Sequence, residues 1–492
     1  MLALPEELLN AIVQYLPLRD VLHLRQVSQH FRAITSSRDL WNQLLRREIQ
    51  VERRIPVPGS KDSSTLSAVE LEDCVRRSLS LHRNWSSASP MTTRKTSAFA
   101  TGSHSAPSIR VISLDFVDLD AHSYLLSVCL NQSSTPRSLL FELWEIGSGD
   151  DGLRCVARKE VRWRGGYAVN KNASAGSGIL ALKTNNIEIL GVDRSRDPEQ
   201  AFITLKTLAT QVKSVLSFIR TTLVVLSESG EVKILDTTRT AGEVELRHPQ
   251  PPLPANQPSI FETLIENDYA ILIRPTTLEL YNLDRFRKAE NVQFLSPVIV
   301  HNFPWRLDSC RIERDTKHAY VSKPSQPAPI NILLRFSSLF PWPVNLLQHY
   351  ILHPNRLYAP SAIMDLDNLP YHFPPVLQQT ISSPIRLFAV SDIALGSYGT
   401  AVWVDSHTEE YFLQGEMGQR LAGLMLSPKP DGEESEDETE PPEFTDKSTQ
   451  SQASSIFDVQ EADDWTRVAV DESEGRIAVG SVTGRIVLYD YA

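Results

Sequence analysis

The spacing of apolar residues changes along the chain and divides it into three parts. Residues 1–50 and about 66–83 carry apolar side chains at the three- and four-residue steps of amphipathic helices. From residue 108 onward, runs rich in Val, Ile, Leu and Phe alternate with polar positions, which is typical of strands. The pattern predicts a mixed multidomain protein: a small all-α head at 1–50, a linker at 51–107 and an all-β body at 108–492.

The first helix is predicted to begin at Pro5 and to end before Pro17. Proline suits the first turn of a helix, because a backbone N–H would be unpaired at that position. Leu8, Ile12 and Leu16 then recur at four-residue steps and form one apolar face. The head therefore starts with an amphipathic helix.

Three further short helices are expected in the head, capped by Asp20, Ser28 and Ser37. A bundle of roughly 45 residues has too much surface for its volume to cover this many large side chains by itself. Part of the apolar face should therefore meet another surface. That surface is either a second protein or the remaining domain of the same chain.

The order and spacing of these residues resemble the F-box motif. The agreement extends from about residue 2 to residue 48 and includes the groups LP, YLP, D, VS, FR and LW as well as the apolar period. F-box proteins dock this module on a Skp-type adaptor, which connects them to a cullin and so to the ubiquitin-conjugating machinery. The resemblance implies that Phe31 and Trp41 hold the module together. It also implies an adaptor-facing set of Leu4, Pro5, Leu8, Leu9, Ile12, Leu18, Val21 and Leu24.

The linker contains one segment with helical periodicity. Leu71, Cys74, Val75 and Leu79 recur at three- and four-residue steps and predict a helix at about 66–83. This helix resembles the helical segment that often follows an F-box. It acts either as a firm spacer between two domains or as a simple packing helix.

Three stretches of the β region repeat one another, at 223–236, 393–405 and 477–490. Each combines an apolar strand, a glycine turn and a second strand that ends in an acidic residue. Weaker copies extend the repeat, and its period of about 40–50 residues predicts a β-propeller, because a single blade cannot bury its own two faces. We expect seven blades, with six as the alternative, and the last strands resemble WD-repeat endings.

The glycines of these turns, Gly230, Gly399 and Gly484, are expected to supply the positive φ of tight hairpins. A strand at 330–336 should divide the longest interval between repeats. Because the stretch RIVLYDYA at 485–492 is typical of a third strand, the outermost strand of the last blade should come from about 90–117 and close the ring.

The net charge of −11 is concentrated in one segment. Residues 431–443 hold eight acidic side chains and no basic one, so the rest of the chain carries only −3. The nearly neutral body lacks the positive field that nucleic acid selects, so we expect no nucleic-acid partner. Residues 428–455 are predicted to be a disordered acidic insert, and Ser435, followed by three acids, is a candidate site for an acid-directed kinase.

Motifs for catalysis, cofactors and metals were sought without success. The four cysteines lie far apart with no CxxC pair, which argues against zinc ribbons and disulfide scaffolds. The stretch GSGDDG at 147–152 matches a dinucleotide motif only formally and is interpreted as a loop between blades. His349 and His353 lack the glutamate of a metalloprotease motif. We expect no catalytic residue, no cofactor and no metal.

One stretch of the propeller offers a candidate surface for a target protein. Arg158, Arg162, Trp163 and Arg164 lie within one predicted strand and turn and combine guanidinium groups with an aromatic ring, which suits an acidic or phosphorylated peptide. The alternative is the solvated face of an edge strand.

These features favour a non-catalytic substrate receptor of a Skp–cullin–F-box ubiquitin ligase that binds an unknown target protein. Neither a signal peptide nor a membrane span is apparent, so we expect an intracellular protein of the cytoplasm, the nucleus or both. The alternatives are an F-box scaffold that assembles a complex without ubiquitination and a propeller enzyme with an unrelated helical cap.

Overall fold

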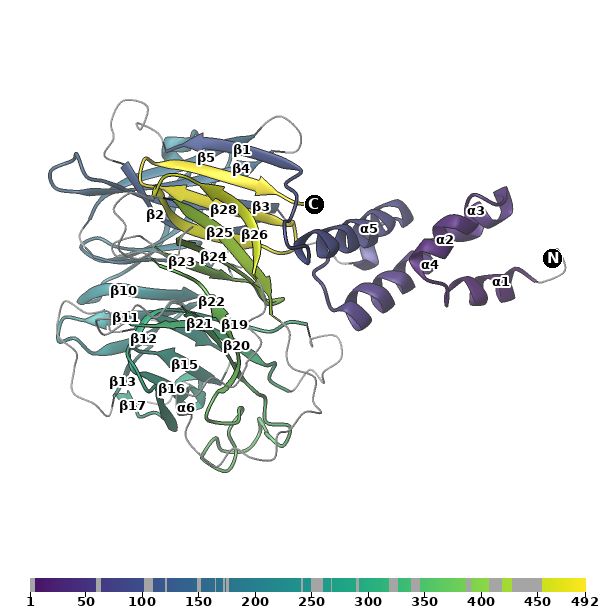
Figure 1. Cartoon of the computed structure of the whole chain (residues 1–492). Coiled ribbons are helices and arrows are strands. Elements are labelled where there is room, and N and C mark those ends of the chain that lie inside the picture. Colours follow the sequence, from purple (N-terminus) through teal and green to yellow (C-terminus); the bar gives the residue numbers. More distant parts are fainter. Residues whose placement is uncertain are drawn as a thin grey trace.

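The structure of the chain is a computed structural model. It describes residues 5–58, 63–100, 109–119, 122–147, 152–163, 165–170, 173, 177–239, 242–248, 260–266, 268–288, 292–317, 326–337, 346–385, 391–406, 418–426 and 454–492. Figure 1 shows a helical head that projects from a ring of β-sheets and is joined to it by one helix near the carboxyl terminus.

The head consists of short helices, as its apolar spacing predicts. They are α1 (Glu6–Val13), α2 (Leu18–Leu24), α3 (Gln29–Thr35), α4 (Arg38–Leu44) and the π-helical segment η1 (Leu45–Arg53). The caps Ser28 and Ser37 are confirmed, because their hydroxyls accept hydrogen bonds from Phe31 N and Leu40 N at 3.2 and 3.4 Å. The predicted cap Asp20 is wrong. Pro17 holds the cap position, and Asp20 lies in the first turn of α2, where its charge faces the positive end of the helix dipole.

The linker helix predicted at about 66–83 is observed as α5 (Ala68–Trp85), preceded by the short 3₁₀ turn η2 (Ser63–Thr65). A capping box fixes its start: Ser67 Oγ accepts from Glu70 N at 3.3 Å, and Glu70 Oε2 accepts from Ser67 N at 2.8 Å. The 18-residue helix is long enough to hold the head away from the ring.

The β region forms seven blades, which confirms the first of the two predicted counts. Each blade is an antiparallel sheet of four strands, and the third gains a fifth strand. Blades 1 to 3 are β2 (Ile109–Leu119), β3 (His122–Asn131), β4 (Ser138–Ile146) and β5 (Leu153–Arg162); β6 (Tyr167–Val169), β7 (Leu180–Lys183), β8 (Ile187–Val192) and β9 (Phe202–Leu208); and β10 (Val212–Ile219), β11 (Thr222–Ser227), β12 (Val232–Asp236), β13 (Glu243–Leu246) and β17 (Phe294–Leu295).

The remaining blades complete the ring. Blades 4 to 7 are β14 (Glu262–Ile265), β15 (Tyr269–Ile273), β16 (Thr277–Asn282) and β18 (Ile299–Asn302); β19 (Leu307–Arg314), β20 (Ile330–Phe336), β21 (Leu346–Leu352) and β22 (Val376–Ser382); β23 (Asp392–Leu395), β24 (Thr400–Ser406), β25 (Gln419–Met425) and β26 (Ser455–Gln460); and β27 (Trp465–Asp471), β28 (Arg476–Ser481), β29 (Arg485–Asp490) and β1 (Arg94–Phe99). Two short helices, η5 (Pro198–Gln200) and α6 (Asp284–Arg287), lie in connections.

The ring closes as the sequence predicts. β1, which precedes the rest of the propeller in the chain, pairs antiparallel with β29 along all six of its residues, from Arg94 opposite Asp490 to Phe99 opposite Arg485. The last blade therefore takes its outer strand from the start of the β region, which covers an edge that would otherwise be open.

The expected strand at 330–336 is observed as β20, and Gly230, Gly399 and Gly484 all have positive φ. Two details of the repeat are corrected. The stretch at 393–405 forms β23 and β24, the first and second strands of its blade, whereas 223–236 and 477–490 supply second and third strands. Every hairpin of a propeller combines alternating apolar positions with a tight turn, so different hairpins look alike in sequence. The stretch 147–152 joins β4 to β5 within one blade and does not lie between blades.

The antiparallel strand order gives the ring two distinct faces. Turns between first and second strands and between third and fourth strands lie at one face, while the other turns and the connections between blades lie at the opposite face. Arg77 of α5 contacts Glu474 in the turn between β27 and β28, so the helix joins the first of these faces. We call it the spacer face and the opposite one the far face.

Candidate functional site

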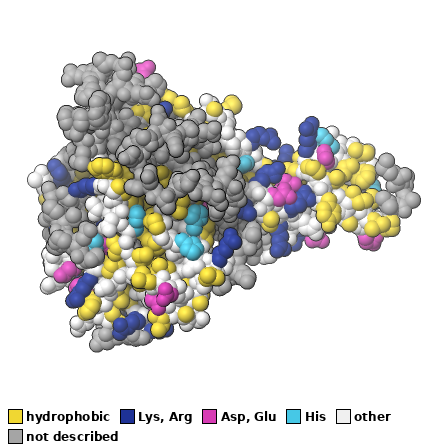
Figure 2. Space-filling view, turned by 60° about the horizontal axis from the view of Figure 1, so that its bottom comes forward, with side chains coloured by type: hydrophobic (Ala, Val, Ile, Leu, Met, Phe, Trp, Pro, Cys, Tyr) yellow, Lys and Arg dark blue, Asp and Glu magenta, His cyan; other side chains and the backbone are white. Residues whose placement is uncertain are grey.

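The first helix of the head presents an apolar stripe to solvent. The exposed fractions of Leu8, Ile12 and Tyr15 are 51%, 52% and 84%, whereas Val13, on the opposite side of the helix, is 2% exposed and packs in the head core. The three exposed residues follow one another at steps of four and three positions, so they share one side of α1 and its carboxyl-terminal turn. We call Leu8, Ile12 and Tyr15 the exposed stripe. Figure 2 shows hydrophobic side chains gathered on the head.

The other residues predicted to face an adaptor differ in exposure. Pro5 is exposed, and Leu9, Leu18 and Leu24 are half-buried against the head core. Val21 is fully buried in that core, so it supports the head instead of contributing contact surface. The helical period shows that this side chain is apolar, but the packing of α2 against its neighbours decides that it points inward. Leu4 lies outside the described residues.

Two exposed apolar residues were not assigned to the contact surface from sequence. Tyr15 belongs to the exposed stripe, and Val27, just beyond α2, is 68% exposed. Both occur in the quoted motif, in YLP and VS, so the signal was present. The position of Tyr15 three residues after Ile12 could have placed it on the same side of the helix.

A buried tryptophan holds the head together, as predicted for Trp41. Its indole Nε1 donates to Thr35 O at 2.9 Å, and the side chain is completely buried. The guanidinium of Arg25 lies 5.5 Å from the Trp41 ring and donates to Thr35 O and Glu72 Oε1, both at 2.8 Å. Because Glu72 belongs to α5, this group connects the head to the linker helix. Phe31 is half-buried.

The end of α1 is fixed by a second arginine. Arg47 of η1 donates to Leu16 O at 2.8 Å and to Gln14 O, and it pairs with the buried carboxylate of Glu48 at 2.7 Å. These bonds satisfy carbonyl groups that the short helix leaves unpaired. The backbone that carries the exposed stripe is therefore held in place from the next layer of the head.

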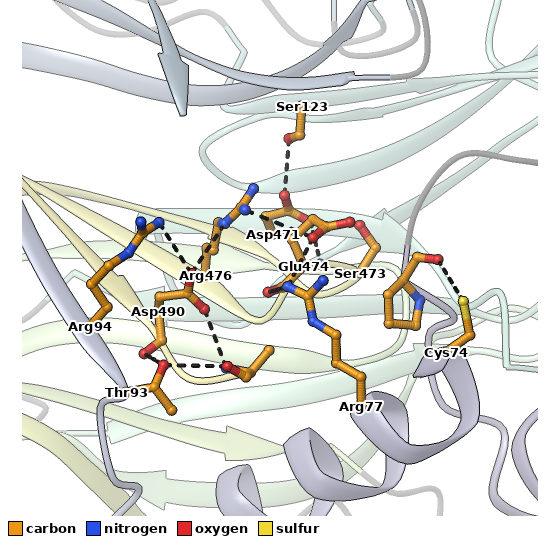
Figure 3. A network of polar contacts seen from close by, with 12 residues as sticks. Cys74, Arg77, Thr93, Arg94, Ser123, Asp471, Ser473, Glu474, Arg476 and Asp490 are labelled. Atoms are coloured by element: carbon orange, nitrogen blue, oxygen red, sulfur yellow. Dashed lines mark hydrogen bonds and ion pairs between the residues drawn. The ribbon is translucent and has the colours of Figure 1, made fainter. Parts of the chain in front are cut away.

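The linker helix is fastened to the last blade at several points. Arg77 Nη2 lies 3.0 Å from Glu474 Oε2, and Asn84 Nδ2 donates to Tyr491 O at 3.0 Å. Figure 3 shows Arg77 directed from α5 toward Glu474, next to the pair of Arg94 and Asp490 that joins β1 to β29. Head, linker helix and propeller are therefore connected by polar contacts that involve both ends of the β region.

The candidate target-binding stretch lies on the far face. Arg162 ends β5, the outermost strand of blade 1, as the edge-strand alternative supposed, and its side chain is exposed. Trp163 is 48% exposed, and its backbone N donates to Arg137 O at 3.0 Å, which places a further exposed arginine beside it. Arg164 lies outside the described residues. So do Ser435 and residues 428–453 of the acidic insert.

Metal-binding groups were sought in the part of the chain that the structure describes. No set of three or more His, Cys, Asp or Glu side chains with the proximity needed for a metal occurs there. His349 is fully buried, its Nε2 lies 2.9 Å from Asn331 Oδ1, and burial lowers its pKa to about 3. It is thus a neutral core residue. The four cysteines are free thiols, and burial raises the pKa of Cys129 and Cys310.

Among the helices of the described residues, none combines the length and the apolar character needed to cross a bilayer.

Comparison with known proteins assigns the head to a family. Residues 1–47 match the F-box-like family model. A search of curated proteins found no match to the chain. The chain thus carries an F-box-like domain at its amino terminus followed by a seven-bladed propeller. This architecture is typical of non-catalytic adaptor and receptor proteins.

Two of the solved structures that match the chain each cover 81% of it. One is the WD40 β-propeller domain of Doa1, with 12% identity over 81% of this chain and 96% of that chain and a TM-score of 0.40. Another is a chain of a humanized mutant of the Chaetomium thermophilum Polycomb Repressive Complex 2 bound to the inhibitor GSK126, with 8% identity over 81% and 97% and a TM-score of 0.47.

Proposed function

We propose that this protein is the substrate-recognition subunit of a Skp–cullin–F-box ubiquitin ligase. The head binds a Skp-type adaptor and, through it, a cullin, while the propeller holds the target protein whose ubiquitination and degradation the complex promotes. The protein itself carries out no chemical step. This role places it in the cytoplasm, the nucleus or both.

The observation that carries the proposal is the exposed stripe within an F-box-like domain. Leu8 and Ile12 each retain about half of their accessible surface and Tyr15 retains most of it, although the head has a well-formed core. Complete burial of a large apolar side chain contributes roughly 1.5–3 kcal/mol, so the stripe offers several kcal/mol to a partner that covers it. Part of this is offset by the loss of freedom on association.

Pro5, Leu9, Leu18 and Leu24 extend the proposed adaptor surface around the stripe. The three leucines are half-buried, so each has less surface to lose on binding than Tyr15. Val21 is left out because it has no surface to offer. The adaptor surface therefore includes α1 and the start and end of α2.

The linker helix supports this role mechanically. α5 is bonded to the head through Glu72 and to the propeller through Arg77 and Asn84. A ligase must hold its target at a defined distance from the conjugating enzyme, and a helix fixed at both ends maintains that distance. We therefore propose that α5 acts as a spacer of fixed length.

For the target, we propose the far-face surface around Arg162, Trp163 and Arg164, which suits an acidic or phosphorylated segment. Arg158, four residues earlier in β5, cannot serve, because its guanidinium is held by Glu142 at 2.9 Å and Glu199 at 2.7 Å within the propeller. Arg162 points from the exposed end of the edge strand, with Trp163 beside it. Charge-assisted hydrogen bonds and cation–π contact would act together there.

The adaptor test is co-purification from cells that express the tagged full-length chain. Leu8→Asp with Ile12→Asp places two carboxylates in the apolar interface, at a cost of several kcal/mol each if they stay unpaired there. We expect this double variant to lose both adaptor and cullin while its thermal unfolding stays unchanged, because both side chains are exposed in the free head. Val69→Asp, at a 78% exposed position of α5, is the matched control and should retain both partners.

The two alternatives give different results in the same experiment. Wild-type yield of adaptor with the double variant would refute the proposed adaptor surface. Recovery of adaptor without cullin by the wild-type chain would favour a scaffold that assembles a complex without ubiquitination.

A further inference from the structure

The connection between β21 and β22 is an unusually long and compact loop on the spacer face. Its ends are joined by an antiparallel bridge between Pro354 and Tyr371, and His372 N donates to His353 O at 2.9 Å. Compact loops with paired ends are frequently functional. We call residues 353–375 the spacer-face loop.

Large aliphatic side chains of this loop are directed into solvent. The exposed fractions of Leu357, Ile363 and Leu366 are 89%, 82% and 68%, and the start of β22 continues the exposure with Val376 at 48% and Leu377 at 43%. Leu357 and Ile363 are more than 80% exposed. Among the other large apolar side chains of the described residues, only that of Tyr15 in the head exceeds this fraction. Figure 2 shows hydrophobic side chains interspersed with polar ones on the propeller surface that comes forward in that view.

The loop is anchored beneath these exposed side chains. Met364 and Leu369 are buried in the core shared by blades 4 and 5, and so is Tyr371. The Tyr371 hydroxyl lies 2.8 Å from that of Tyr269, in blade 4. Ile363 and Leu366 therefore flank a buried anchor, and the chain cannot turn them inward without giving up that core contact.

Two polar side chains set the shape of the loop from within. Asn368 accepts from Ala359 N at 2.9 Å and donates to Ala359 O and Ile363 O, both at 3.1 Å. Asp365 Oδ1 accepts from the backbone N of Asp367 and of Asn368, both at 3.1 Å. Because the backbone is already fixed, a partner that binds the exposed side chains has little conformational entropy to remove.

The charges of the loop indicate the chemistry of its partner. Leu366 lies between Asp365 and Asp367, both exposed, and residues 357–375 contain no lysine or arginine. The only lysine or arginine within 353–375 is Arg356, which directly precedes this stretch in the sequence. A second copy of the chain would bring carboxylates against carboxylates, which is unfavourable in a partly desolvated contact. A groove with an apolar floor and a basic rim has the complementary pattern.

We propose that the spacer-face loop is a docking surface for a protein that presents an apolar groove rimmed by lysine or arginine. Ile363 and Leu366 enter the groove, and Asp367 pairs with its rim. This surface is distinct from the exposed stripe of the head and from the far face, and the proposal is independent of what the head binds.

The test compares full-length variants in affinity purification and then in a purified system. We expect one and the same bound protein to be lost from two variants: the double variant Ile363→Lys with Leu366→Lys, and the single variant Asp367→Lys. The head variant Leu8→Asp with Ile12→Asp and the control Val69→Lys should retain that protein. That protein, purified, should bind the wild-type chain directly. We expect at least tenfold weaker binding by the double variant and weaker wild-type binding at 0.5 M than at about 0.1 M salt, because a charge-assisted contact is screened.

Three outcomes would overturn the proposal. The first is that every protein retained by the wild-type chain is also retained by the loop variants. The second is direct binding that is insensitive to Asp367→Lys and to salt. The third is a wild-type dimer in light scattering that Ile363→Lys with Leu366→Lys converts to a monomer, which would make the loop a contact between copies. Unchanged thermal unfolding of the variants shows that the fold is intact.

Discussion

The indole ring of Trp85 lies edge-on against the ring of Tyr491, with 6.2 Å between the ring centroids. Trp85 ends α5, and Tyr491 is the penultimate residue of the chain. Phe457 of β26 completes the cluster, 6.3 Å from Trp85 and 5.3 Å from Tyr491. The helix that carries the head is therefore packed into the apolar core of the last two blades, in addition to its polar contacts.

Trp85→Ala should loosen the connection between spacer and propeller. Truncation of a buried tryptophan removes its apolar contacts and leaves a cavity, so we expect the free energy of unfolding to fall by about 3–5 kcal/mol. The measurements are chemical denaturation and limited proteolysis, with faster cleavage near residues 58–92. Trp163→Ala is the matched control at a half-exposed ring and should change stability by less than about 0.5 kcal/mol. Equal protease resistance of Trp85→Ala and wild type would contradict the assigned role.

Arg25→Ala should weaken the attachment of the head to α5. The variant loses the 2.8 Å pair with Glu72, the bond to Thr35 O and the contact with the Trp41 ring. We expect a loss of about 1–3 kcal/mol, because a half-buried charge-assisted contact is stronger than a surface pair. The rate of hydrogen exchange of the backbone amides in α2 and α3 measures this loss of stability. Arg32→Ala, at an exposed position of α3, should leave these amides as protected as in wild type, and similar exchange in both variants would refute the prediction.

Arg220 occupies a left-handed turn that a buried asparagine holds in place. Its φ is 55°, and Asn170, fully buried, accepts from Arg220 N and donates to Arg220 O, both at 2.9 Å. Only glycine adopts this conformation without strain, so Arg220→Gly should be more stable than Arg220→Ala by about 1 kcal/mol. Denaturant unfolding compares the two variants. Equal stability would mean that the turn relaxes to a different conformation.

Asn170→Ala should destabilise the same turn more strongly. The variant leaves the backbone groups of Arg220 and the carbonyl of Gly178 without their buried partner. An unsatisfied buried polar group costs about 1–3 kcal/mol, so the free energy of unfolding should fall by at least that amount. A loss below about 0.5 kcal/mol in the same measurement would show that water replaces the amide.

Glu472 makes stability depend on pH between blades 6 and 7. Its carboxylate accepts from Tyr398 N at 2.7 Å and Thr400 N at 2.8 Å, yet burial raises its pKa from 4.5 to about 7. The folded protein thus binds this proton more tightly than the unfolded chain. The resulting stabilisation is complete below about pH 4.5 and is lost as the pH rises through about 7.

Glu472→Gln should remove this dependence. Between pH 5 and 8, the wild-type chain should lose more stability than the variant, by an amount on the order of 2–3 kcal/mol. Denaturant unfolding at the two pH values gives the difference for each protein, so other titrating groups cancel in the comparison. Parallel losses in both proteins would show that Glu472 does not titrate in this range.

Most of the helices of the head could be predicted from interactions between residues that are close together in the sequence. Ser28 and Ser37 cap helices because a hydroxyl before an apolar run satisfies free N–H groups within the same few residues. Asp20 failed as a cap because Pro17 starts α2 three residues earlier. For Leu8 and Val21 the sequence showed two apolar side chains in one motif. The exposure of 51% for the first and 0% for the second depends on helices packing from other parts of the chain.

In the propeller, too, local features could be predicted from sequence, whereas features that depend on distant contacts could not. Apolar alternation and glycine turns revealed strands and a repeat, since both are properties of neighbouring residues. The stretch at 393–405 resembles 223–236 and 477–490 in sequence although it forms a different hairpin of its blade, because all hairpins share that pattern. The spacer-face loop was not recognised, because the exposure of Ile363 and the burial of Met364 beside it follow from contacts with blade 4.

The sequence by itself thus determined the order of a helical head, a linker helix and a ring of blades, because the spacing of apolar residues and the caps and turns between them act over short distances. Only the tertiary structure decided which of the apolar side chains stay in solvent. That choice depends on how much surface distant elements cover when they pack, as with Val21 in the head core and Leu366 on the surface of the propeller.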